Sequence, residues 1–136
     1  MSTKQIVVTQ YDLDRLRRLV NEAVAMGSRD ELAGLIGELD RAIVVAPHEI
    51  PSDVVTMNSH VRLVDVETGD AMEISLVFPD DAISAAGAVS ILAPVGTAII
   101  GYGQGDSVEW PTPSGLRTFR IDQVIFQPEA AGEWDL

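Results

Sequence analysis

The sequence of 136 residues contains no cysteine, a single lysine and only 5% aromatic residues. Without cysteine, a disulfide framework, a thiolate zinc site, an iron–sulfur cluster and a cysteine nucleophile are all excluded. Basic residues are also scarce, since 9 of them stand against 21 acidic residues for a net charge of −12. Proteins that bind nucleic acid by releasing counterions need a basic surface. We therefore expect no direct sequence-specific binding of nucleic acid. The acidity points to partners with basic protein surfaces or to plain solubility.

Long hydrophobic runs are missing as well. The apolar segment at residues 6–8 is too short for a signal peptide or a membrane span. Gly87, Pro94 and Gly96 interrupt the weakly polar stretch at residues 85–100. These features predict a soluble, cytoplasmic protein without a membrane partner, and a monomer is the oligomeric state that we favour.

Before Pro47 the apolar residues recur at a helical spacing. Leucine and valine at steps of three and four residues predict a first amphipathic helix over residues 12–26. Gly27 follows directly, and glycine is the residue that most often ends a helix. We expect this helix to present one apolar face to a partner element.

A second helix is predicted to follow after a very short turn. A capping box at residues 28–31 indicates its start, and the pattern continues over about residues 30–45. The two helices would form a short antiparallel coiled-coil hairpin within residues 1–48. Gly34 and Gly37 each weaken the second helix by about 1 kcal/mol. The hairpin would therefore need contacts with the rest of the chain to be stable.

After Pro47, short β-rich runs alternate with turn residues. We predict strands at residues 60–66, 71–78, 90–93, 107–110 and 116–126. A hairpin turn is expected at residues 67–70, a bulge at Asp122-Gln123 and a short helix that begins with Pro94. Residues 49–136 are thus predicted to be a β-rich domain, and the fold class is α+β.

No motif carries a catalytic constellation. The glycines at alternate positions of residues 101–106 lack the spacing of a dinucleotide-binding fingerprint, which also needs a strand before it and a helix after it. His48 and His60 are the only histidines, and a metal site would need both together with carboxylates. Ser59 precedes His60, but adjacent strand residues face opposite ways. We therefore expect no catalytic residue, no metal site and no cofactor.

Two features remain candidates for contact with a partner. Asp30 and Glu31 would lie at the hairpin tip, where they either cap the second helix and complement its dipole or present an acidic tip to a partner or a metal. The other feature is an apolar turn in an otherwise acidic protein, which is either a core-facing helix start or an exposed protein contact. Its residues are Ala93, Pro94, Val95 and Gly96.

Two stretches of the chain resemble a known bacterial family. Residues 39–42 with 54–59, and residues 93–101 with the Gly105-Asp106 pair and the tail at 126–132, are similar to the regulators of nucleoside diphosphate kinase. The second stretch is also similar to the C-terminal domain of the Gre transcript cleavage factors. The resemblance implies an FKBP-like antiparallel β-sheet domain with a short helix behind a coiled-coil hairpin. It also implies binding to RNA polymerase at the mouth of the secondary channel, with the loop at residues 93–96 at the contact.

The hairpin departs from the Gre pattern because its arms are much shorter. A Gre hairpin carries acidic tip residues to the catalytic magnesium, and a tip retracted by tens of ångströms (at ~1.5 Å per residue) is too far away to ligate it. Asp30 and Glu31 therefore do not inherit the cleavage role by resemblance. The expected protein is a non-catalytic transcription regulator that competes with Gre-type factors and affects nucleoside diphosphate kinase indirectly.

Two other functions stay open. The acidic surface also allows a direct protein–protein regulator of a nucleotide-metabolising enzyme. An FKBP-like domain suggests prolyl isomerase activity as well, which would need an aromatic-lined apolar pocket. Trp110, Phe78 and Phe119 are the main aromatic candidates in a chain that is poor in aromatics.

Overall fold

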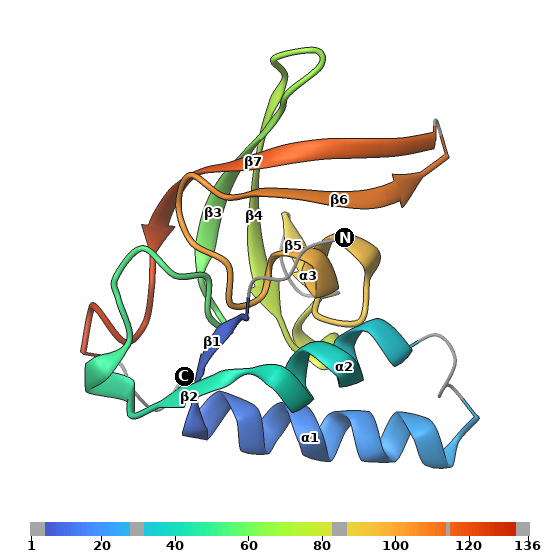
Figure 1. Cartoon of the computed structure of the whole chain (residues 1–136), viewed down its shortest axis with the longest axis vertical. Coiled ribbons are helices and arrows are strands. Elements are labelled where there is room, and N and C mark those ends of the chain that lie inside the picture. The colour runs from blue at the N-terminus through green and yellow to red at the C-terminus, as the bar shows by residue number, and fades with distance from the viewer. Residues whose placement is uncertain (1–4, 28–31, 83–86, 114, 133–136) are drawn as a thin grey trace.

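The computed structural model describes residues 5–27, 32–82, 87–113 and 115–132. In Figure 1 a curled five-stranded sheet lies above two helices, and a third, short helix lies between the sheet and the second helix. A short two-stranded sheet connects the helical part to the rest, because Val7 N–H donates to Gly101 O at 3.1 Å. The predicted α+β class is confirmed.

The first helix agrees with the prediction. Helix α1 spans Gln10–Ala25, and the hydroxyl of Thr9 caps it by accepting from Asp12 N–H at 3.0 Å. Gly27 adopts φ +92° just past its end, the conformation that makes glycine a helix terminator. Helix α2 spans Ala33–Arg41 and runs back in the opposite direction (Figure 1). Within the described ranges, none of the helices combines the length and the hydropathy that crossing a bilayer requires.

The second helix is shorter than predicted. It ends at Arg41, and Ile43–Val45 form strand β2, which pairs in parallel with β1 (Val7–Thr9). Three successive β-branched residues lose side-chain freedom in a helix and fit a strand better. Pairing with β1 supplies the backbone partners that a helix would have provided, so the prediction of helix through Val45 was wrong. A 3₁₀ turn, Pro47–Glu49, follows β2.

The larger sheet contains most of the predicted strands. Its order is β5-β4-β3-β7-β6. The strands are β3 (His60–Asp65), β4 (Ala71–Val77), β5 (Ala88–Ser90), β6 (Ser107–Thr112) and β7 (Gly115–Phe126). The predicted bulge is confirmed, because Arg62 pairs with Gln123 and Leu63 pairs with Ile121, which leaves Asp122 without a partner in the register. Helix α3 spans Pro94–Ile99 and begins with its proline, as predicted.

Two predictions about this sheet were wrong. The sheet is mixed rather than antiparallel, since β5 pairs in parallel with the last three residues of β4, Ala88 opposite Ser75 and Ser90 opposite Val77. The 3₁₀ turn Pro79–Asp81 follows β4. Strand β5 spans Ala88–Ser90 instead of the predicted residues 90–93, so residues 91–93 are not part of a strand. Strand β6 continues through Pro111, which an edge strand tolerates because its outer N–H groups need no partner.

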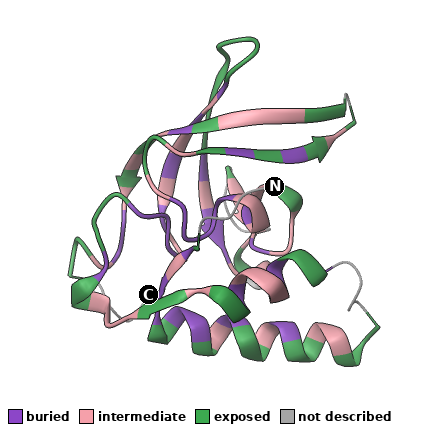
Figure 2. Cartoon of the chain, in the orientation of Figure 1, coloured by how far each residue is buried: buried purple, intermediate pink, exposed green. Residues whose placement is uncertain are grey.

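One hydrophobic cluster joins the two parts of the chain (Figure 2). Ile6, Leu16 and Leu35 from the helical part are 0% exposed and pack in the same cluster as Leu63 and Ile121 from the sheet. Helices α1 and α2 are therefore stabilised by contacts with the sheet.

Candidate partner-binding site

The turn at residues 93–96 forms the start of α3. Ala93 is the N-cap residue and Pro94 the first helical residue. Proline suits this position because it has no N–H to leave without a partner in the first turn. Thr97 N–H donates to Ala93 O at 3.0 Å, and the Thr97 hydroxyl donates to Ile91 O at 2.9 Å. Pro94 is exposed on this ordered turn, while Val95 is half-buried against the core.

Gly96 is buried and has a packing role. A Cβ at this position would lie 3.0 Å from the Leu76 side chain and well inside contact distance of Ser90 O. The absence of a side chain lets α3 pack closely against β5 and β4. Of the four candidate residues, Pro94 is therefore the one most exposed to a partner.

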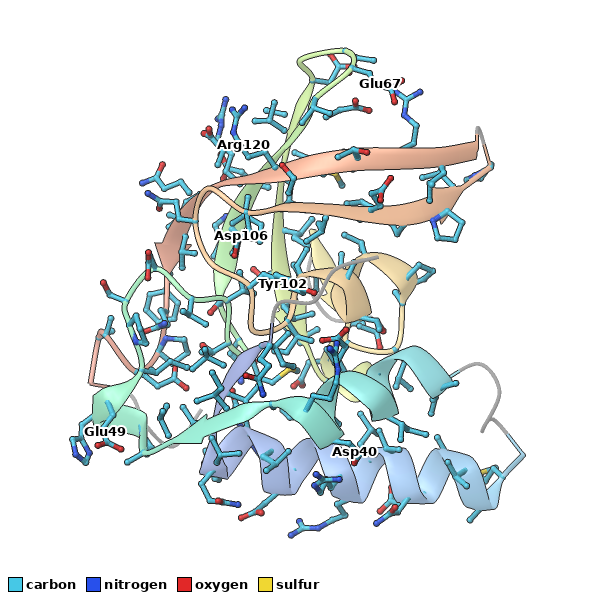
Figure 3. All side chains as sticks on the ribbon, in the orientation of Figure 1. Asp40, Glu49, Glu67, Tyr102, Asp106 and Arg120 are labelled. Carbon is cyan, nitrogen blue, oxygen red and sulfur yellow. The ribbon has the colours of Figure 1, made fainter. Side chains whose placement is uncertain are left out.

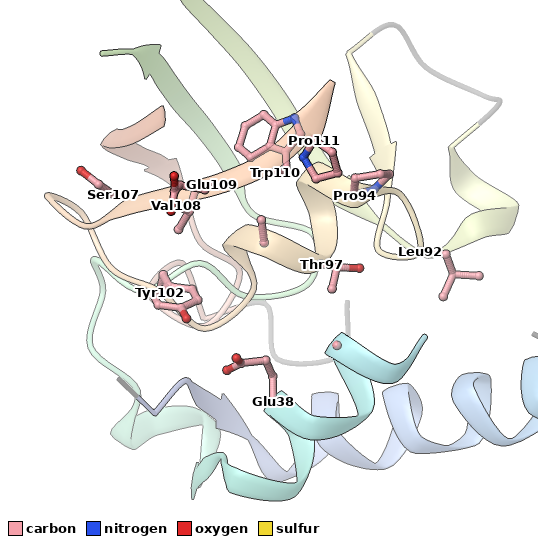
Figure 4. A pocket seen from close by; sticks show the side chains of 12 residues that line it. Glu38, Leu92, Pro94, Thr97, Tyr102, Ser107, Val108, Glu109, Trp110 and Pro111 are labelled. Carbon is pink, nitrogen blue, oxygen red and sulfur yellow. The ribbon is translucent and has the colours of Figure 1, made fainter. Parts of the chain in front are cut away.

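Pro94 borders a groove of about 540 Å³ between α2, α3 and β6. Figure 4 shows Glu38 of α2 on one side of it and Trp110 and Pro111 of β6 on the other. The remaining lining residues are Gly34, Leu92, Thr97, Ala98, Tyr102, Ser107, Val108 and Glu109. Sequence reasoning missed the contributions of α2 and β6, because these segments are far apart in the chain and meet only in the folded protein.

Apolar and acidic side chains both line the groove. The Trp110 ring stacks on Phe119 with the ring centroids 4.2 Å apart and the planes within 10°. This stacking holds the tryptophan in one orientation. Among the described residues of the lining, Glu38 and Glu109 carry a charge and none is a lysine, arginine or histidine. A bound group is therefore expected to be apolar with a positive charge.

Asp30 and Glu31 lie outside the described residues. Elsewhere, acidic side chains are spread over the whole protein. Figure 3 shows Asp40 and Glu49 in the helical part and Glu67 at the far end of the sheet.

A buried carboxylate joins α1 to the sheet domain. Asp12 is 1% exposed, and its Oδ2 accepts from Met57 N–H at 3.1 Å while its Oδ1 accepts from Arg15 at 2.6 Å. Burial raises the pKa of Asp12, although these two hydrogen bonds lower it. The Arg15 guanidinium lies 3.9 Å from the centroid of the Tyr11 ring and 4.7 Å from that of Phe78. The orientation of α1 is thus held by polar as well as apolar contacts.

Residues 54–59 and 127–132, which both belong to the stretches that carry the family resemblance, contact each other next to this carboxylate. Gln127 donates to Pro51 O at 2.8 Å and to Val54 O at 2.7 Å. The Thr56 hydroxyl donates to Glu129 at 2.7 Å. Residues 54–59 and 127–132 are therefore in contact within the fold.

His60 makes two cross-strand contacts that sequence reasoning missed. Its Nδ1 lies 2.8 Å from Ser75 Oγ and its Nε2 lies 3.1 Å from Glu73 Oε1. His60 and Ser75 are directly opposite each other in the register of β3 and β4. We interpret the three residues as cross-strand pairing on the sheet surface.

Metal ligation finds no support in the part of the chain that the structure describes. No group of three histidine or acidic side chains there is placed to hold an ion. The loop at residues 101–106 is structural, because Asp106 accepts from Gly103 N–H at 2.7 Å.

Asp65 makes the hairpin between β3 and β4 sensitive to acid. Its carboxylate accepts from Arg117 at 2.7 Å and from Glu67 N–H at 2.9 Å, and the Arg117 bond is the main reason that the pKa of Asp65 is lowered from 3.8. A lowered pKa means that the charged form stabilises the fold, and that this contribution is lost as the pH falls below 3.8. We expect Asp65→Asn to be less stable than wild type at neutral pH, with the difference shrinking below pH 3.8.

Urea denaturation at a series of pH values measures this difference. Asp70→Asn in the same turn is the matched control, since Asp70 is exposed. A wild-type minus Asp65→Asn difference that stays constant down to pH 2 (on the order of two units below the usual aspartate pKa) contradicts the assigned cause.

Comparison with known proteins identifies the class. The family model "Transcription elongation factor, GreA/GreB, C-term" matches residues 50–126, and the model "Rnk N-terminus" matches residues 4–45. The solved structure "Prokaryotic transcription elongation factor GreA/GreB from Nitrosomonas europaea" has a TM-score of 0.76 and 40% identity, covering 90% of this chain and 100% of that chain. The fold is therefore that of a GreA/GreB-type factor.

Two curated relatives narrow the family. The transcription elongation factor GreA of Azorhizobium caulinodans is 33% identical over 132 residues, covering 85% of this chain and 84% of the relative. The regulator of nucleoside diphosphate kinase of Escherichia coli (strain K12) is 36% identical over 135 residues, which are 98% of each chain. The chain belongs to the family of regulators of nucleoside diphosphate kinase, which is related to the Gre factors.

Proposed function

We propose that this protein binds RNA polymerase at the rim of the secondary channel and regulates transcription without stimulating transcript cleavage. Support for the partner comes from its relatives, several of which are named transcription elongation factors. The observation that carries the proposal is the exposed Pro94 at the start of α3, on the turn that the Gre resemblance assigns to polymerase contact. A turn fixed by proline and by the two Thr97 hydrogen bonds binds without ordering a loop.

The short length of the helical hairpin supports a tip that does not take part in transcript cleavage. Helix α2 has 9 residues and therefore spans about 14 Å. Transcript cleavage of the Gre type needs a carboxylate within about 2.0–2.6 Å of the catalytic ion. We propose that Asp30 and Glu31 stay outside this distance, so that the protein occupies the channel mouth and competes with Gre-type factors. Residues 1–48 would act as a short hairpin, and residues 49–136 as an FKBP-like docking domain.

A pull-down with purified core RNA polymerase tests the contact. Wild type is expected to be retained, and Pro94→Asp to lose at least tenfold in affinity, because a carboxylate replaces the exposed apolar ring. Pro51→Asp is the matched control, since Pro51 is also exposed but lies outside the groove. If the Pro94 and Pro51 variants are retained equally, Pro94 is not part of the contact. If wild type itself is not retained, RNA polymerase is not the partner.

A transcription assay on backtracked elongation complexes tests the mechanism. The protein alone is expected to release no cleavage product, and in excess it is expected to slow the cleavage that a Gre factor stimulates. Release of short 3′ fragments by the protein alone contradicts the proposed inactive tip.

A second candidate comes from the name of its relatives. The Escherichia coli relative is called a regulator of nucleoside diphosphate kinase. Direct binding to that enzyme would give co-purification with the kinase in the absence of polymerase. Under our proposal the kinase does not co-purify, and its level changes through gene expression.

A further inference from the structure

We infer that the groove between α2, α3 and β6 binds a protein segment in which an arginine or lysine is adjacent to an apolar side chain, and that Glu38 selects for the cation. The inference rests on the proposed function, since the segment would belong to the polymerase. The inference adds α2 to a docking surface that otherwise consists of the turn at residues 93–96.

The shape and lining of the groove specify the apolar half of the segment. Its volume of about 540 Å³ accommodates one or two side chains of the size of leucine or arginine. Trp110, fixed by its stacking on Phe119, and Pro111 form one wall, and Leu92 and Pro94 extend it towards the surface. Rigid aromatic and proline surfaces bind apolar side chains without losing much conformational entropy.

The charges of the groove specify the other half. Glu38 and Glu109 line it from opposite elements, α2 and β6, and no basic residue is among the lining residues that the structure describes. Glu38 Oε1 accepts from Arg41 at 2.8 Å. Its second oxygen, Oε2, is buried and accepts no hydrogen bond from the residues that the structure describes. Because Oε2 has almost no exposed surface, the inferred segment acts on the Glu38 carboxylate as a nearby positive charge and not as a hydrogen-bond donor to that oxygen.

Charge also argues against two other occupants of the groove, namely the C-terminal end of this chain and a second copy of the chain. The last four residues of the chain, Glu133 to Leu136, include two acidic residues and no basic one. A second copy of the chain brings another net charge of −12. Both would place like charges against Glu38 and Glu109, so a basic partner is favoured.

Tryptophan fluorescence tests the inference directly, because Trp110 lines the groove and the chain has a single further tryptophan to replace. In a Trp134→Phe background, the blocked peptide acetyl-Leu-Arg-Leu-Arg-Leu-amide is titrated against the same peptide with citrulline for arginine. We expect the arginine peptide to shift the Trp110 emission and to bind at least tenfold more tightly than the citrulline peptide. Glu38→Gln should abolish this preference, whereas Asp40→Asn, an exposed acid on α2 outside the groove, should keep it.

Equal binding of the two peptides, or an unchanged preference in Glu38→Gln, overturns the inference. So does a concentration-dependent dimer mass that is lost with Glu38→Gln, because a second copy would then be the occupant. A melting temperature of Glu38→Gln equal to that of wild type verifies that the variant is folded.

The polymerase pull-down separates this inference from the proposed function. Tenfold weaker retention of Glu38→Gln, with Asp40→Asn unchanged, supports both. Retention of Glu38→Gln equal to wild type overturns the groove inference and leaves polymerase binding intact. No retention of wild type overturns the proposed function and the assignment of the segment to polymerase, while the peptide titration still decides whether the groove selects a cation.

Discussion

Gly101→Ala is expected to lower the free energy of unfolding by about 2–5 kcal/mol. Gly101 has φ +78°, a conformation that costs an alanine about 1–2 kcal/mol. The new Cβ would also meet the Cβ of Ile6 well inside contact distance and would lie 3.1 Å from Val7 N. Overpacking of this kind typically costs about 1–3 kcal/mol. The substitution therefore acts where β1 is hydrogen-bonded to the sheet domain, through Val7 N–H and Gly101 O.

Gly105→Ala is the control that separates the two causes. Gly105 has φ +94°, but no atom lies within 4 Å of the Cβ that it would acquire. This variant should lose only the conformational part, about 1–2 kcal/mol. Urea denaturation followed by circular dichroism measures both. Equal losses in the two variants would contradict the close packing of Ile6 on Gly101.

Asp12→Ala is expected to destabilise the protein by about 2–4 kcal/mol. The substitution leaves Met57 N–H without its acceptor and Arg15, whose side chain is 21% exposed, without its counter-charge. Removing one member of a buried pair is costly because the other charge remains desolvated. Denaturation of Asp14→Ala supplies the baseline, since Asp14 is an exposed residue of the same helix. A loss no larger than that baseline would mean that Asp12 does not hold α1 to the sheet domain.

The pH dependence of Asp12 has the opposite sign to that of Asp65. Because burial raises the pKa of Asp12 above 3.8, the native state binds its proton more tightly than the unfolded state does. The contribution of this group to stability is therefore fully present below pH 3.8 and is lost as the pH rises through the raised pKa. Asp12→Asn stays neutral and keeps an acceptor for Met57 N–H. Its stability relative to wild type should accordingly increase over the same pH range.

Local signals predicted much of the fold correctly. Gly27 after an amphipathic pattern marked the end of α1, and Pro94 marked the start of α3. The turn at residues 67–70 and the bulge at Asp122 were also visible in the sequence. Each of these features depends on the conformational preference of one or two residues, which acts wherever they occur in a chain.

Residues 43–45 show where local signals failed. Their apolar spacing continued the helical pattern of α2, and the decision for a strand came from β1, which lies 36 residues earlier in the register (Val7 with Ile43). The parallel pairing of β5 with β4 depends in the same way on a distant segment. Non-local backbone pairing leaves no trace in a short window of sequence.

The candidate site also has one part that local sequence predicted and one part that it did not. The exposed Pro94 turn was identified from residues that are adjacent in the chain. Its groove was not, because Glu38, Pro94 and Trp110 come from three separate elements that only packing brings together. Residues 30–31 were chosen from the sequence and lie outside the described structure.

The amino-acid sequence by itself determined the acidity of this protein, its lack of thiol chemistry, its α+β class and the positions of its main turns. These properties follow from composition and from preferences of single residues and short windows. Only the tertiary structure decided that Asp12 joins α1 to the sheet domain and that α2 completes the groove beside Pro94. The physical reason is that burial and charge proximity depend on which distant segments pack together, and many packings are compatible with the same local pattern.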